Sequence, residues 1–156
     1  MKYIKLTQNK FTLVDDEDFD RLNQFKWYWT GRYVIRNLKL PGNKRTTKSL
    51  HREVLNLSKN ILLVDHIDRN SLNNQKINLR LVNNLQNNMN RKIQVNNTSG
   101  YKGVTFNKKM SKWRGQIYFK NKYIYLGYFH DPKEAAEIYN KTATNLFGQF
   151  ANLNTI

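Results

Sequence analysis

The residues best suited to chemistry are an aspartate and a histidine that directly follow an apolar run. Asp65 and His66 come after residues 61–64 and before a polar segment rich in Asn and Ser, so we expect an apolar strand to end at this pair. A carboxylate is a hard ligand suited to Mg²⁺, and a histidine with a pKa near 6.5 takes a proton from water at neutral pH. Phosphodiester hydrolysis uses both groups. For an isolated pair, the alternative is that Asp65 caps a turn and His66 satisfies a hydrogen bond.

The pair is not isolated, because amide side chains follow it in one compact segment. This segment supplies Asn73-Asn74, Asn78 and Asn87-Asn88. Amide oxygens are neutral ligands, and oxygen coordination favours Mg²⁺ or Mn²⁺ over zinc. The chain has no cysteine, so any metal must be held by Asp, Glu, Asn, Gln or His, and zinc sites built on Cys pairs are excluded.

The strings VDHID, NN, NLRLV and QNNMNR within residues 64–91 resemble the HNH family of phage and intron-encoded endonucleases. In that family a ββα-metal motif surrounds one divalent cation. The resemblance implies that His66 is the general base and that Asp65 and Asn87 are ligands of Mg²⁺ or Mn²⁺. It also implies that Asn78 holds the imidazole in its working orientation.

Two of these positions have alternatives. If the helix register differs, Asn84 or Asn88 can replace the last metal ligand. Asn73 or Asn74 can compete for the position that orients the imidazole.

Upstream, Leu50-His51-Arg52 resembles the Leu-His-Arg element that often precedes the HNH motif. We expect His51 and Arg52 to contact DNA phosphates or to support the motif, with ordinary surface positions on a helix over residues 49–56 as the alternative. The opening residues also look like the N-terminal segment of many such proteins, so the HNH-like similarity covers residues 1–92.

The elements that must position these residues are predicted from apolar periodicity and turn formers. Short strands are expected at residues 3–6, 11–14, 26–29 and 33–38. The acidic residues 15–18 precede apolar residues at helical spacing and suit an acidic first turn, with a metal site as the alternative. Beyond the polar loop, helical spacing groups Leu79, Val82, Leu85 and Met89 on one helix.

The pattern changes after residue 92. Residues 93–99 have little periodicity and are predicted to form a linker. Strands are then expected at residues 101–106, 113–119 and 123–128, and a helix at residues 132–147. These elements predict a three-stranded antiparallel sheet packed on one helix.

This second half resembles the ethylene-response-factor, or APETALA-type, DNA-binding domain, which also accompanies HNH nucleases. The matching pieces are Tyr101-Lys102-Gly103-Val104, Lys112-Trp113, Leu126-Gly127-Tyr128-Phe129, Glu134-Ala135-Ala136, Tyr139 and Ala151-Asn152. The resemblance implies a sheet that lies in the DNA major groove. The positions that it implies for DNA contacts are Lys102, Thr105, Asn107, Gln116, Tyr118, Tyr123 and Tyr125.

Side-chain alternation gives an independent argument for the same face. Arg114, Gln116 and Tyr118 share one side of their strand, and the opposite side carries Trp113, Ile117 and Phe119. We add Arg114 to the DNA contacts on this ground. Arg and Gln contact base edges, and Lys side chains contact phosphates. The alternative is a solvated, aromatic-rich sheet face. Several family positions differ here, so the target sequence does not transfer.

Composition supports a polyanion as partner. The 156 residues (18.7 kDa) carry 27 Lys and Arg against 11 Asp and Glu, a formal charge of +16, which favours nucleic acid over a membrane surface or a ribosomal site. A chain of this length makes one ordinary domain or two small ones and has no room for a large deep-pocket enzyme. No apolar run approaches the length of a membrane span, so we expect a soluble intracellular protein.

We therefore predict an α+β protein with an HNH nuclease domain at residues 1–92, a linker at 93–99 and a DNA-binding domain at 100–156. Its expected function is divalent-metal-dependent cleavage of double-stranded DNA, of the homing or mobile-element type, in the cytoplasm of a bacterial or phage-infected cell. The alternatives are a sequence-specific DNA-binding protein with an inactive HNH half and an RNA-binding accessory protein.

Overall fold

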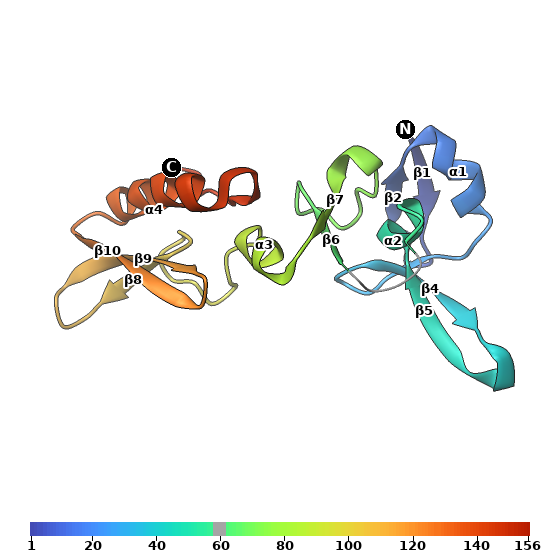
Figure 1. Cartoon of the computed structure of the whole chain (residues 1–156), viewed down its shortest axis with the longest axis horizontal. Helices are drawn as coiled ribbons and strands as arrows, with labels where there is room; N and C mark the ends of the chain where they lie inside the picture. The colour runs from blue at the N-terminus through green and yellow to red at the C-terminus, as the bar shows by residue number, and fades with distance from the viewer. Residues whose placement is uncertain (58–61) are drawn as a thin grey trace. The chain divides into compact units, whose positions relative to one another are not determined.

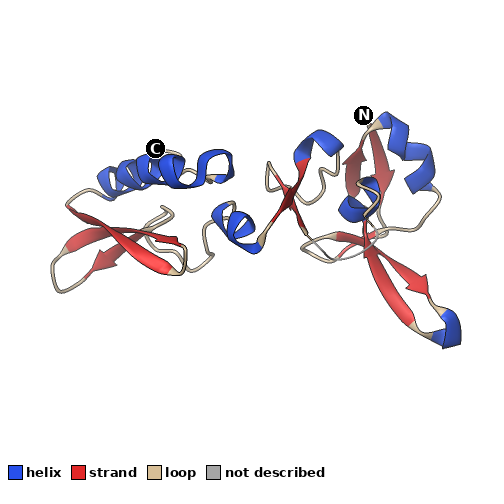
Figure 2. Ribbon diagram, in the orientation of Figure 1, coloured by secondary structure: helices blue, strands red, loops and turns tan. Residues whose placement is uncertain are grey.

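The computed structural model describes residues 1–57 and 62–156 and divides the chain into two compact units, Met1–Asn83 and Asn84–Ile156. Figure 1 labels their elements, and Figure 2 separates helices from strands. Residue 61, which we predict to begin the apolar strand, lies outside the described residues. Both α and β elements occur in each unit, in agreement with the predicted α+β class.

The first unit is built on small antiparallel sheets. Its strands are β1 (Lys2–Lys5) paired with β2 (Phe11–Val14), β3 (Tyr28–Trp29), β4 (Val34–Lys39) and β5 (Arg45–Ser49) in one sheet, and β6 (Leu63–His66) paired with β7 (Leu79–Val82). Its helical segments are α1 (Asp16–Asn23), α2 (Leu50–Val54), η1 (Pro41–Asn43) and η2 (Lys76–Asn78). Strands are thus present at each predicted place in residues 1–40, and β5 is additional.

A continuous apolar core holds these elements together. Trp27, Leu22 and Leu50 are completely buried and pack with Val64 of β6 and Leu79 of β7. The β6–β7 hairpin is therefore fixed at its base to the rest of the unit by apolar side chains.

The hairpin corrects one prediction. Leu79 and Val82 belong to a strand rather than to a helix, because Leu79–Val82 pairs antiparallel with Leu63–His66. Helical spacing over four residues is also compatible with a strand, and here main-chain pairing determines the outcome. The helix begins later, as α3 (Asn84–Met89).

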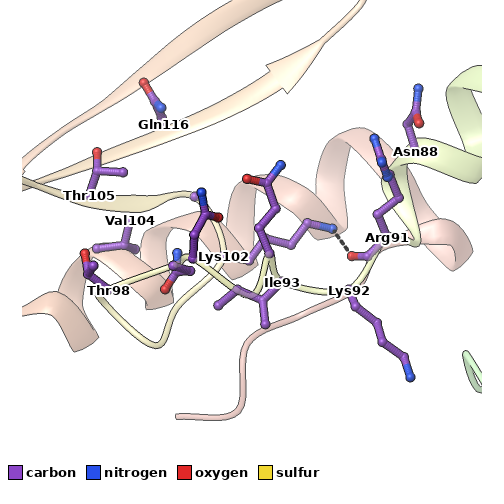
Figure 3. A pocket seen from close by; sticks show the side chains of 13 residues that line it. Asn88, Arg91, Lys92, Ile93, Thr98, Lys102, Val104, Thr105 and Gln116 are labelled. Atoms are coloured by element: carbon purple, nitrogen blue, oxygen red, sulfur yellow. Dashed lines mark hydrogen bonds between the residues drawn. The ribbon is translucent and has the colours of Figure 1, made fainter.

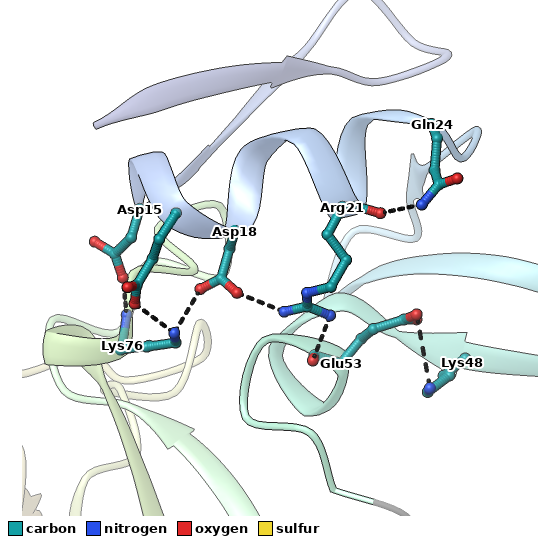
Figure 4. A network of polar contacts seen from close by, with 8 residues as sticks. Asp15, Asp18, Arg21, Gln24, Lys48, Glu53 and Lys76 are labelled. Carbon is teal, nitrogen blue, oxygen red and sulfur yellow. Dashed lines mark hydrogen bonds and ion pairs between the residues drawn. The ribbon is translucent and has the colours of Figure 1, made fainter.

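A network of ion pairs ties α1 to the loop before β7 (Figure 4). Asp15 accepts a hydrogen bond from the Lys76 main-chain N–H at 2.7 Å, and the Lys76 ammonium lies 3.0 Å from Asp18. Asp18 also pairs with Arg21, which donates to the Glu53 carbonyl oxygen on α2. The acidic first turn predicted for this helix is present, and its carboxylates form ion pairs with Lys76 and Arg21.

The second unit contains a three-stranded antiparallel sheet and a long helix. Its elements are α3, β8 (Val104–Asn107), β9 (Lys112–Phe119), β10 (Lys122–Phe129), α4 (Pro132–Phe147) and η3 (Gly148–Phe150). The strand order is β8-β9-β10, and the apolar side of β9 packs on α4 through Ile117, Tyr139 and Ala143. Pro132 lies in the first turn of α4 and Asp131 caps it by accepting from Lys133 N–H, as helix-start rules lead one to expect.

The boundary between the units falls before α3 rather than after it. Leu85 and Met89 of α3 pack with Ile117, Tyr139 and Phe147 of the second unit. The segment after α3 is fastened as well, because Asn152 donates to the Arg91 carbonyl oxygen at 2.8 Å. Residues 84–92, which the sequence assigns to the nuclease half, therefore belong to the second unit by their contacts.

The described part of the chain has no helix that combines the length and the apolar character needed to span a bilayer.

Candidate functional site

His66 ends strand β6 and its ring is held by a chain of hydrogen bonds. Its Nε2 lies 3.1 Å from the Asn74 Oδ1, and the Asn74 Nδ2 donates to the Thr12 Oγ1 at 2.8 Å and to the Ser71 carbonyl oxygen at 3.1 Å. The Ser71 carbonyl only accepts, so the Asn74 amide must present its oxygen to the histidine. His66 therefore carries its proton on Nε2, and the neutral ring has its basic lone pair on Nδ1.

The surroundings of His66 keep the ring neutral. Burial lowers its pKa from the usual 6.5 and outweighs the hydrogen bond with Asn74 and the charges of Asp68 and Asp65, which raise it. The side chain is only 6% exposed. A histidine in this state is a proton acceptor at neutral pH.

Asn78 has a different neighbour from the one that the HNH resemblance implies. Its Nδ2 donates to the Asp68 Oδ1 at 2.9 Å and to the Asn73 carbonyl oxygen, and its Oδ1 accepts from the Asp68 N–H. Asn78 thus closes the loop that follows His66, while Asn74, the alternative noted for this position, bonds the imidazole. Asn74 reaches the ring because β2 contributes Thr12 as its support.

The loop also holds an ionised carboxylate close to the imidazole. Burial by itself would raise the pKa of Asp68, but hydrogen bonds from the Asn70 N–H and from the side chains of Asn73 and Asn78 bring it below its usual value. Asp68 is therefore a fixed negative charge near His66, and its carboxylate oxygens already accept hydrogen bonds from residues of the loop.

His51 lies against His66 inside the unit. The two ring centroids are 5.5 Å apart and edge to face, and the Tyr33 ring centroid lies 5.1 Å from that of His51. His51 is 7% exposed, and burial, followed by the charges of His66 and Arg52, lowers its pKa to about 3. The described geometry fits the expected support of the motif and does not fit a surface contact to a phosphate. Arg52 donates to the Leu62 carbonyl oxygen at 2.9 Å.

Asp65 forms an ion pair across the hairpin. It stands opposite Arg80 in the β6–β7 register, and its Oδ2 accepts from the Arg80 Nη2 at 2.8 Å and from Nε at 3.0 Å. Both side chains are mostly buried, with exposed fractions of 11% and 15%. The pair fixes the carboxylate beside His66 on the same strand end.

The donor set near His66 is oxygen-rich and small. Among the described residues, no group of three or more His, Cys, Asp or Glu is placed to hold a metal ion. Mg²⁺ keeps several waters and is often bound through one or two carboxylates together with substrate phosphates. A single carboxylate such as Asp65 is compatible with a cation held in this way, and a closed zinc site is not.

The last predicted ligand lies in the second unit. Asn87 and the alternatives Asn84 and Asn88 are all on α3, whereas Asp65 belongs to the first unit. The choice among these three amides therefore remains a prediction.

The polar face of the second sheet brings together most of the predicted DNA contacts. Cross-strand pairing puts Thr105 opposite Arg114, Tyr118 opposite Tyr123 and Gln116 opposite Tyr125, and directly opposed residues share a face. The Tyr118 and Tyr123 rings are 4.9 Å apart and both are at least half exposed.

One member of this face was missed. Tyr128 pairs with Arg114, lies 5.4 Å from the Tyr125 ring and accepts a hydrogen bond from Asn107. Simple alternation from Tyr125 puts Tyr128 on the apolar side, but a register shift between Tyr125 and Gly127 restores it to the polar face. Gly127, with φ of 130°, is the sequence signal for this irregularity.

Lys102, an expected phosphate contact, is hydrogen-bonded to the main chain of the second unit. Its ammonium donates to the Met89 carbonyl oxygen at 2.8 Å and to the Arg91 carbonyl oxygen at 2.9 Å. Lys102 therefore fastens the end of α3 and the following segment beside the sheet.

Known proteins provide an independent comparison. The chain is 39% identical over 88 residues to protein 3.8 of Escherichia phage T7, a match that covers 56% of this chain and 72% of the phage protein. The chain belongs to the protein 3.8 family.

A second relative of this chain is named after the HNH motif. The chain is 39% identical over 95 residues to a protein of Acanthamoeba polyphaga mimivirus named as an uncharacterized HNH endonuclease. The match covers 61% of this chain and 48% of the mimivirus protein, so the chain spans about half of that relative. This partial match supports an HNH nuclease. No family model matches the chain, and no solved structure matches it significantly.

Proposed function

We propose that the chain is a divalent-metal-dependent DNA endonuclease of the HNH type, in which a nuclease unit cuts DNA that an ethylene-response-factor-like unit recognises. The observation that carries the proposal is the neutral His66, whose Nε2 proton is directed to Asn74 and whose neighbour on β6 is a carboxylate. Similarity to the mimivirus protein supports the same reaction class.

In this proposal His66 takes the proton from the attacking water at Nδ1, since Nε2 already carries a proton bonded to Asn74. Asn74 and Thr12 hold the ring at a fixed angle, and Asn78 with Asp68 keeps the adjoining loop closed. Asp65 would be a ligand of Mg²⁺ or Mn²⁺, as the HNH resemblance implies. When bound, such a cation stabilises the charge on the phosphate and on the leaving oxygen.

In the proposed recognition unit the polar face of the sheet lies on duplex DNA. Arg and Gln side chains suit base edges, and the tyrosines suit the sugar-phosphate backbone and thymine methyl groups. The proposed contacts are Thr105, Asn107, Arg114, Gln116, Tyr118, Tyr123, Tyr125 and Tyr128.

One observation favours a second candidate function. Asp65 is ion-paired with Arg80, and a carboxylate bonded to a guanidinium is a weaker partner for a cation. In a sequence-specific DNA-binding protein with an inactive nuclease unit, the ion pair between Asp65 and Arg80 would not need to break to admit a cation.

Incubation of the purified chain with supercoiled plasmid and Mg²⁺ distinguishes the two. Nicked or linear product that is absent with EDTA is expected for the endonuclease. Unchanged plasmid with Mg²⁺ and with Mn²⁺, together with tight binding of a duplex, would support the second candidate.

A further inference from the structure

A polar groove runs along the sheet of the second unit, beside the segment that follows α3. It consists of two adjoining cavities of about 440 and 540 Å³ that share Asn88, Arg91, Gln94 and Gln116. Figure 3 shows the first cavity, with Thr105 and Gln116 on the strands and Asn88 of α3 and Arg91 of the following segment on the other side.

The walls of this groove carry positive charge and amides. Arg91 and Lys92 are exposed and line it, and no acidic residue lines either cavity within the described part of the chain. The whole unit from residue 84 onward has eleven Lys and Arg against three Asp and Glu. Cationic and amide side chains of this kind contact phosphate and sugar oxygens in protein–DNA complexes.

The basic wall is fixed in place although it lies outside regular secondary structure. The Arg91 carbonyl oxygen accepts from both Lys102 and Asn152, and Lys102 also binds the Met89 carbonyl oxygen. The main chain that carries Arg91 and Lys92 is thus held by Lys102 and Asn152 before any ligand binds, which reduces the entropy lost on binding.

The floor of the groove belongs to the proposed DNA face. Thr105 and Gln116 line the first cavity, and Tyr118 and Tyr123 line the second. A DNA strand whose bases contact this sheet face would have its sugar-phosphate backbone beside residues 88–94.

We propose that the groove seats the sugar-phosphate backbone of one strand of duplex DNA, with Arg91 and Lys92 as phosphate contacts. This site rests on the proposed function of the second unit and extends the DNA interface from the sheet to the segment that follows α3.

A charge-matched pair of variants tests the site. Arg91→Gln with Lys92→Gln removes two charges from the groove, and Lys133→Gln with Lys141→Gln removes two from the exposed side of α4. Duplex binding by the full chain is measured in EDTA across a salt series. The groove variant should lose about two units of the slope of log affinity against log salt, about one for each phosphate contact. Equal slopes in both variants would overturn the proposal.

A crosslink tests position without changing charge. Because the chain has no cysteine, Gln94→Cys in the groove and Asn145→Cys on α4 each accept a single photocrosslinker. Crosslinking to a duplex is expected from Gln94→Cys and not from Asn145→Cys. The reverse yield, or equal yields, would contradict the groove as the DNA seat.

The same samples separate this proposal from the nuclease. If the Gln94→Cys variant crosslinks to the duplex while the wild-type chain does not cut plasmid, the groove is retained and the endonuclease is lost. A chain that cuts with Mg²⁺ while the groove variant keeps the full salt slope retains the endonuclease and loses the groove.

Discussion

The hydrogen bonds around His66 have a direction that sets which nitrogen acts as the base. The Thr12 hydroxyl donates to the Leu72 carbonyl oxygen, accepts from Asn74, and so leaves the Asn74 oxygen to the histidine. Thr12 and Asn74 are almost completely buried, and a buried chain in which every member is satisfied holds one arrangement. The amide that controls the imidazole thus comes from a loop supported by a distant strand.

We expect Asn74→Asp to move the acid limb of the cleavage pH profile to higher pH. The variant keeps an oxygen beside Nε2 and adds a negative charge, which stabilises the protonated imidazole and raises the pKa of His66 from its lowered value. Single-turnover cleavage across the acid range measures the limb. An unchanged limb with reduced rate would mean that Asn74 has only a structural role.

His51 gives a pH dependence of stability whose sign follows from its burial. Its pKa of about 3 in the folded chain lies below the ordinary 6.5, so between these values the unfolded chain binds the extra proton. The stabilising contribution is complete above pH 6.5 and is lost as the pH falls toward 3. His51→Phe, which keeps a ring beside His66, should therefore reduce the loss of stability in urea denaturation as the pH is lowered. Parallel pH dependences for the two proteins would contradict this.

Among the elements, the segment after α3 lies outside regular secondary structure and is held in place by a side chain. Lys102 binds two main-chain carbonyl oxygens there, and Gly103 follows with φ of 78°, where an added Cβ would lie 2.2 Å from the Tyr139 ring. This glycine permits close packing of β8 on α4, and the lysine before it fastens α3.

Lys102→Met should lower the free energy of unfolding of the second unit by about 1.5 to 3 kcal/mol, the usual range for hydrogen bonds to a charged group. Urea denaturation measures the change, and Lys109→Met at an exposed position is the control. If stability is unchanged and only the salt slope of DNA binding falls by about one unit, Lys102 is the phosphate contact that the sequence predicts.

Most elements could be predicted from sequence where local chemistry is sufficient. Helix α4 agrees with its predicted bounds, because Pro132 and the Asp131 cap determine its start. Strand β5 was missed, since Arg45–Ser49 is polar and is a strand through its pairing with β4. For the candidate site, Asp65 and His66 are found from their place at the end of an apolar run. The hydrogen bond of Asn74 rather than Asn78 to the imidazole depends on Thr12, which is far away in the chain.

At the scale of the whole molecule, the division before α3 changes which fragments should fold. Leu85 and Met89 contribute to the core of the second unit, and each buried apolar side chain is worth about 1.5 to 3 kcal/mol. A fragment of residues 84–156 should therefore unfold at a higher urea concentration than one of residues 93–156, by circular dichroism. Equal stability of the two fragments would mean that α3 does not contribute to the core of the second unit.

Because the two units have different proposed roles, DNA binding and strand cleavage should be lost in different variants. DNA affinity should depend mainly on the polar sheet face and the groove, whereas strand cleavage should require His66. The proposed base contributes to catalysis and not to binding, so its removal separates the two activities.

The measurement that tests this most directly is single-turnover cleavage by His66→Ala beside its DNA affinity, with Mg²⁺ for cleavage and EDTA for binding. Loss of a general base is worth about 10²- to 10⁴-fold in rate, and we predict a loss of this size with the affinity for duplex DNA unchanged. Cleavage by His66→Ala at close to the wild-type rate would contradict the assignment of His66 as the base and with it the proposed nuclease site.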